Sequence, residues 1–112
     1  WINICDVFMS FGSTATIDAL IAGKLTICPV YPGFVSNYLF RDSGATLAPE
    51  SLEEIINIFK KVAKGSHDNA LKRLDPARLD FLKQRVGLID GKASARIEAL
   101  ALNMAGIGCE YE

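Results

Sequence analysis

A turn rich in serine, threonine and glycine is the part of the sequence best suited to bind a ligand. It contains Ser10, Gly12, Ser13 and Thr14, and it stands between a short apolar stretch and a helix-like stretch. If a strand precedes it, the turn combines free backbone N–H groups, the positive end of a helix and small side chains. These features favour an anion, most often phosphate. Ser13 or Thr14 could instead simply cap the helix, and the turn alone leaves both roles open.

Asp18 adds a second chemical group to the turn. It lies four residues after Thr14, so the two side chains project from the same face near the start of the helix. A carboxylate there could accept hydrogen bonds from ribose hydroxyls while the turn binds phosphates. The alternative role is a favourable charge in the first turns of the helix, worth only about 0.3–1 kcal/mol. Because Ile17 and Ala19 flank it, an acid is an unusual choice for that purpose alone.

Several other kinds of chemistry are disfavoured. The turn matches neither G-x-x-x-x-G-K-[ST] nor G-x-G-x-x-G, which argues against a P-loop nucleotidase or a dinucleotide oxidoreductase. The cysteines at 5, 28 and 109 are widely spaced, and His67 is the only histidine, so we expect no metal site and no cofactor. We interpret the cysteines as small buried hydrophobes and His67 as a solvated residue in a polar link between helices. A reducing, cytoplasmic location fits this cysteine usage.

The sequence on either side of the turn predicts the secondary-structure elements that position it. Residues 4–10 form an apolar run, residues 15–22 carry apolar side chains at helical spacing, and residues 25–30 form a second apolar run ending near Pro29. Strand, helix and strand in this order predict the β-α-β unit of a parallel sheet. Residues 44–48 could supply a third, brief strand. The aromatic loop after the second strand, with Tyr31, Phe34, Asn37 and Tyr38, could contact a base or a sugar, but we interpret these as surface-loop residues.

Helices dominate the rest of the chain. Ser51 and Glu54 have the spacing of a capping box, and the helix that they begin should end at Gly65. Asp75-Pro76 predicts the start of another helix, which should end at Gly87, and a last helix should follow Asp90. These helices carry more apolar surface than three short strands can cover.

We therefore predict an α/β fold, the C-terminal part of a doubly wound Rossmann-like parallel sheet domain with the order β-α-β-β followed by helices. Residues 1–112 would form one α/β domain or domain fragment. Residues 1–50 would be the nucleotide-diphosphate-binding β-α-β unit and residues 51–112 a helical tail. The chain opens at Trp1 without an initiator methionine, which we interpret as the sign of a fragment. The uncovered apolar faces could pack on a missing N-terminal domain or on a second copy, in a homo-oligomer.

Composition and net charge argue against several classes of binding partner. Half of the 112 residues are hydrophobic and 22% are charged, which argues against intrinsic disorder. With 12 lysines and arginines against 13 acids, the net charge of -1 gives no electrostatic reason to expect nucleic acid or an anionic membrane. No apolar run approaches the roughly 20 residues of a transmembrane helix, and no signal peptide is apparent.

Two segments resemble a known superfamily. Residues 6–24 read D-V-F-M-S-x-G-S-T-x-T-x-D-A-L-x-A-G-K, which resembles the donor-binding β-α-β unit of GT-B-fold nucleotide-sugar glycosyltransferases. Non-hydrolysing UDP-N-acetylglucosamine 2-epimerases and CDP-glycerol glycerophosphotransferases of surface polysaccharide synthesis are similar there. Residues 90–97, D-G-K-A-S-A-R-I, resemble the D-G-K-A-S-x-R-I signature that often closes capsule-type and glycerophosphotransferase-type members.

The resemblance implies a function. Gly12, Ser13 and Thr14 match the loop that contacts the donor diphosphate, and Asp18 matches the acid that contacts the ribose. A UDP- or CDP-linked sugar would be the partner, and a missing N-terminal domain would supply the general base. A 2-epimerase or a glycerophosphotransferase binds the same kind of ligand, so both stay alternatives to a glycosyltransferase. A non-catalytic α/β interaction module and a small phosphate-binding regulatory domain are alternatives from other classes.

Overall fold

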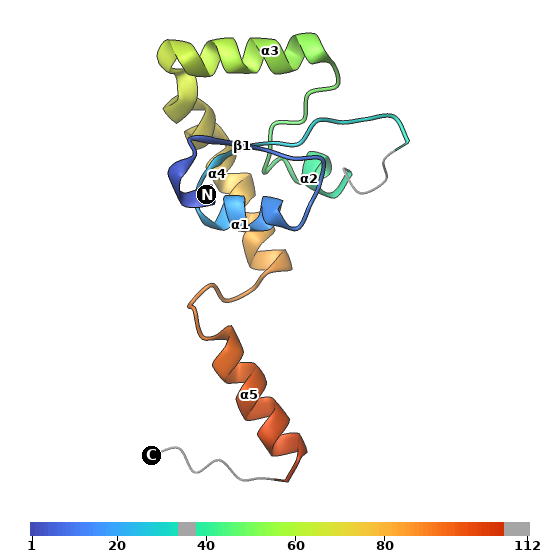
Figure 1. Cartoon of the computed structure of the whole chain (residues 1–112), viewed down its shortest axis with the longest axis vertical. Helices are drawn as coiled ribbons and strands as arrows, with labels where there is room; N and C mark the ends of the chain where they lie inside the picture. The colour runs from blue at the N-terminus through green and yellow to red at the C-terminus, as the bar shows by residue number, and fades with distance from the viewer. Residues whose placement is uncertain (34–37, 107–112) are drawn as a thin grey trace.

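The computed structural model describes residues 1–33 and 38–106 (Figure 1). A single-turn 3-10 helix, η1, spans Ile2–Ile4 and leads into the first strand. The remaining elements follow in chain order: β1 Val7–Met9, α1 Ala15–Ile21, β2 Leu25–Ile27, α2 Tyr38–Ser43, α3 Leu52–Lys61, the π-helical turn η3 Val62–Ser66, α4 His67–Arg85 and α5 Ala93–Met104.

The predicted β-α-β unit is present. Strands β1 and β2 pair in parallel, with Val7 opposite Leu25, and α1 connects them. Both strands are shorter than expected, because residues 2–4 turn into η1 and Pro29, which has no N–H to donate, follows soon after β2. The third strand is reduced to a single parallel bridge between Ile27 and Leu47. The described residues therefore combine helices with a two-stranded parallel sheet, and no further strand of a doubly wound sheet occurs among them.

The core lies where the sheet meets α1, α2 and α4. Leu20 on α1 and Cys28 after β2 are buried, and Phe40 on α2 meets Phe81 on α4 with ring centroids 5.7 Å apart. Burial of such side chains is the main favourable term for a unit this small. The core thus holds α1, the helix that follows the candidate turn, through Leu20 near its C-terminal end.

Helix α3 begins as the capping box predicts. The hydroxyl of Ser51 accepts a hydrogen bond from the N–H of Glu54 at 3.2 Å. The carboxylate of Glu54 reaches back one residue further than in a standard box and accepts from the N–H of Glu50 at 2.8 Å. Gly65 adopts a positive φ of 89° in η3, where the chain turns from α3 into α4.

Two predictions about the next helix are wrong. Helix α4 begins at His67 and passes through Pro76 as one helix, so Asp75-Pro76 does not start it. The ring of Pro76 removes one backbone hydrogen bond, but the burial of Phe81 and Leu82 in the core holds the helix together across this point. His67 is also not a solvated linker residue, because its Nε2 donates to the carbonyl oxygen of Asp6 at 2.9 Å.

Helix α5 extends away from the rest of the chain (Figure 1). Its apolar side chains stay largely in solvent, with Ile97 68% exposed and Met104 81% exposed. The apolar face that the sequence predicts is therefore not covered by any described residue. No described helix combines the length and the apolar character that a membrane crossing needs.

Candidate functional site

The candidate turn begins where the two strands end together. The N–H of Ser10 donates to the carbonyl oxygen of Ile27 at 3.1 Å, which joins the carboxyl ends of β1 and β2. Gly12 follows with a φ of 89°, a conformation that other residues adopt only with strain. The chain then enters α1 at Ala15. The turn thus lies at the carboxyl edge of the sheet, where ligands of parallel sheets bind.

Ser10 shapes this turn from within. Its hydroxyl is 2.7 Å from the hydroxyl of Thr16 and accepts a longer hydrogen bond, of 3.4 Å, from the N–H of Gly12. Thr16 is fully buried, so its polar atom needs a partner inside the protein. The structure therefore places the predicted ligand residue Ser10 in an internal contact. The sequence analysis missed Thr16, although a hydroxyl at the start of a buried helix face was the available signal.

The side chains of Ser13 and Thr14 differ in the hydrogen bonds that they make at the start of α1. The hydroxyl of Ser13 accepts a hydrogen bond from the N–H of Ala15 at 3.1 Å. The backbone carbonyl of Ser13 accepts one from the N–H of Thr16 at 2.9 Å. Thr14, at the N-cap position of α1, makes no side-chain capping bond. Ser13 therefore supports the helix start, whereas the exposed hydroxyl of Thr14 is available to a ligand.

Asp18 lies one turn along α1 from Thr14. Both residues are exposed, and the Asp18 carboxylate has no partner among the described residues. It sits in the first turns of α1, where a negative charge is favourable. Thr14 and Asp18 therefore form a small polar surface beside the turn.

The floor of the turn is uncharged. The Cys28 side chain is 1% exposed, and burial raises the pKa of its thiol above the usual value, while hydrogen bonds with Thr16 and Thr46 oppose this shift. The thiol therefore stays protonated, as expected of a small buried hydrophobe. Cys5 is only partly buried, contrary to the same expectation, and Cys109 lies outside the described residues. In the described ranges, no cluster of three or more histidine, cysteine, aspartate or glutamate side chains could hold a metal ion.

An apolar groove of about 450 Å³ lies beside the turn, at the same edge of the sheet. Met9 and Phe11 line it from the end of β1, Tyr31 from the loop after β2, and Leu52 from the start of α3. Phe11 and Tyr31 meet edge to face, with ring centroids 6.2 Å apart. Of the other loop residues considered, Phe34 and Asn37 lie outside the described residues, and Tyr38 begins α2.

The second segment of the resemblance forms the start of α5. The Asp90 carboxylate accepts from the N–H of Lys92 at 3.0 Å and pairs with the Arg96 guanidinium at 2.8 Å. Arg96 thereby lowers the pKa of the Asp90 carboxyl group. This Asp–Arg pair orders the segment locally, which is a structural role.

Two backbone N–H groups of the turn are unpaired in the described part of the chain. Those of Ser13 and Thr14, just before α1, meet no acceptor among the described residues. A scan against protein-family models and searches of the curated proteins and of the solved structures each found no match for this chain.

Proposed function

We propose that this chain is the nucleotide-sugar-binding portion of a GT-B-like glycosyltransferase that acts in the synthesis of surface polysaccharides or glycoconjugates. The observation that supports this proposal is the Gly12 turn at the carboxyl end of β1, followed by a helix that keeps Thr14 and Asp18 exposed on one face. The turn and residues 90–97 carry the two sequence patterns of that superfamily. The ligand would be a UDP- or CDP-linked sugar.

The turn would act on the diphosphate. The free N–H groups of Ser13 and Thr14, with the Thr14 hydroxyl, would donate to its oxygen atoms. The same donors would stabilise the negative charge that builds up as the nucleoside diphosphate leaves, which is catalysis by preorganised dipoles. The Asp18 carboxylate would accept hydrogen bonds from the ribose hydroxyls. A general base would come from an N-terminal domain across the cleft.

An NMR titration of the 112-residue chain with UDP, CDP and inorganic phosphate tests this proposal. We expect UDP or CDP to shift the amide signals of residues 12–18 in a saturable way, and phosphate to shift them only at higher concentration. Thr14→Val should weaken binding of all three ligands. Asp18→Asn should weaken only the nucleotides, because phosphate has no ribose. Glu98→Gln, at an exposed position on α5 outside residues 90–97, is the matched control for Asp18→Asn and should change nothing.

Each other outcome of the titration supports a different function for the chain. If none of the three ligands shifts these signals, the site is not a nucleotide site and the chain is an interaction module. If phosphate binds as tightly as UDP and CDP, the turn belongs to a phosphate-binding regulatory domain. If the isolated chain transfers sugar efficiently, the assignment of the base to another domain is wrong.

A further inference from the structure

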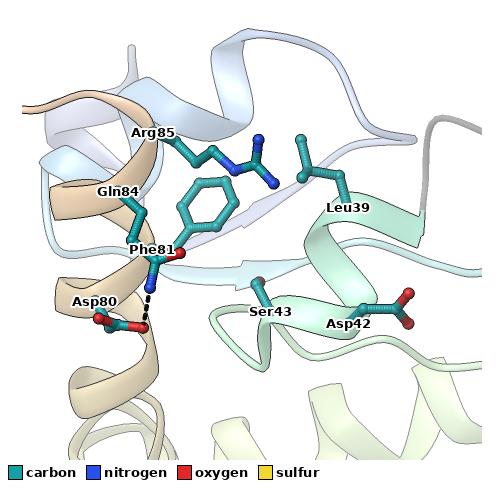
Figure 2. A pocket seen from close by; sticks show the side chains of 7 residues that line it. All are labelled: Leu39, Asp42, Ser43, Asp80, Phe81, Gln84 and Arg85. Atoms are coloured by element: carbon teal, nitrogen blue, oxygen red, sulfur yellow. Dashed lines mark hydrogen bonds between the residues drawn. The ribbon is translucent and has the colours of Figure 1, made fainter.

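A second cavity lies between α2 and α4, away from the turn. The two helices pack through Phe40 and Phe81, and beside this contact they leave a space of about 570 Å³ (Figure 2). That volume falls in the range of roughly 300–1,000 Å³ typical of small-molecule sites. Phe81 and Leu39 give the cavity its apolar surface.

The two ends of the cavity carry opposite charges from α4. In Figure 2 the Arg85 side chain extends from α4 toward Leu39, passing beside the Phe81 ring. Asp80 lies lower on the same helix, where it accepts a hydrogen bond of 2.7 Å from the Gln84 side chain. The two charges form no ion pair with each other, and the Arg85 guanidinium has no acceptor among the described residues. Its five N–H donors are therefore available.

The α2 side of the cavity adds no net charge. Asp42 lines the cavity, but its carboxylate pairs with the neighbouring Arg41 at 2.8 Å and points away from α4 in Figure 2. The hydroxyl of Ser43 donates to the carbonyl of Phe40 at 2.7 Å and accepts from the N–H of Ala45 at 3.1 Å. One cation and one carboxylate on α4 thus determine which ligands the cavity favours.

We propose that this cavity binds a small zwitterion, with its carboxylate on Arg85, its ammonium on Asp80 and its apolar body on Phe81 and Leu39. Arginine binds carboxylates through two parallel hydrogen bonds, which fixes their orientation. A ligand with a single charge leaves either Arg85 or Asp80 without a counter-charge. Because both side chains are exposed and screened by water, the dissociation constant should be on the order of 1 mM. This site is independent of the nucleotide site at the turn.

The test is an NMR titration of the whole chain with 4-aminobutyrate and 6-aminohexanoate. Hexanoate and hexylamine, which carry one charge each, are the comparison ligands. We expect the zwitterions to shift the amide signals of residues 39–43 and 80–85 in a saturable way, with at least tenfold higher affinity than either single-charge ligand. UDP should leave these signals unchanged, which separates this site from the proposed nucleotide site.

Variants of Arg85 and Asp80 test which charged group of the ligand each side chain binds. Arg85→Gln should reduce the affinity of the zwitterions to that of hexylamine, and Asp80→Asn should reduce it to that of hexanoate. Lys83→Gln removes an exposed charge from α4 that does not line the cavity, and it should leave the affinity unchanged. All three positions are exposed, so the variants should fold like the original chain. The proposal is overturned if no saturable shift occurs up to millimolar excess, if hexanoate or hexylamine binds as well, or if Arg85→Gln has no effect.

Discussion

Arg78 joins α4 to the C-terminal end of α1, and its replacement tests how strongly this contact stabilises the fold. Its Nη1 donates to the carbonyl oxygen of Leu20 at 2.8 Å, and its Nε donates to the Asp75 carboxylate at 2.9 Å. The Arg78 side chain is only 16% exposed. A cation at this place also meets the negative end of α1. Arg78→Gln removes the charge and the guanidinium that donates to both acceptors at once, while it keeps a polar side chain.

The expected cost follows from these contacts. A hydrogen bond between a charged group and a carbonyl contributes about 1.5–3 kcal/mol to the free energy of unfolding. The Leu20 carbonyl keeps a second donor, the N–H of Gly23 at 3.1 Å, so it is not left without a partner. The Asp75 side chain is 43% exposed, so water can solvate its carboxylate in the variant. Loss of the ion pair therefore lowers the unfolding free energy by only about 0.2–1 kcal/mol. We expect Arg78→Gln to lower the unfolding free energy by about 2 kcal/mol.

Urea unfolding followed by circular dichroism measures this loss. Arg78→Lys keeps the charge but not the planar fork, so it should recover only part of the stability. Arg73→Gln, at an exposed position of the same helix, is the matched control and should lie within about 0.5 kcal/mol of the original chain. A loss below about 0.5 kcal/mol for Arg78→Gln, or an equal loss for Arg73→Gln, would refute the reasoning.

Two further predictions concern the core and the start of α4. Leu20 is fully buried, so Leu20→Ala should lower the unfolding free energy by about 2–5 kcal/mol, whereas Leu52→Ala, at a side chain 72% exposed, should cost far less in the same urea experiment. The hydrogen bond to the Asp6 carbonyl, with a smaller contribution from Asp68, raises the pKa of His67. A raised folded-state pKa gives stability that is complete below the unfolded value of about 6.5 and is lost as pH rises through the folded value. Stability should therefore fall as the pH rises above about 6.5, and by more in the original chain than in His67→Gln, and equal slopes would contradict this assignment.

The sequence by itself determined the local elements. The helix over residues 15–21 and the capping box at Ser51 follow from side-chain spacing and from backbone groups a few residues apart. The placement of Thr14 and Asp18 on one face follows from helical geometry, whereas the exposure of that face depends on packing. These features depend on short-range hydrogen bonds, so a reading of neighbouring residues predicts them.

Only the tertiary structure decided the features that join distant residues. Arg78 contacts Leu20 across 58 positions and His67 contacts Asp6 across 61, and no local pattern encodes either pair. The same holds for the continuous α4, because packing of Phe81 outweighs the break that Pro76 predicts. The cavity beside the Phe40–Phe81 contact exists only because α2 and α4, which are distant in the sequence, pack together. Such features depend on which surfaces are buried against each other, and that is settled only when the whole chain has packed.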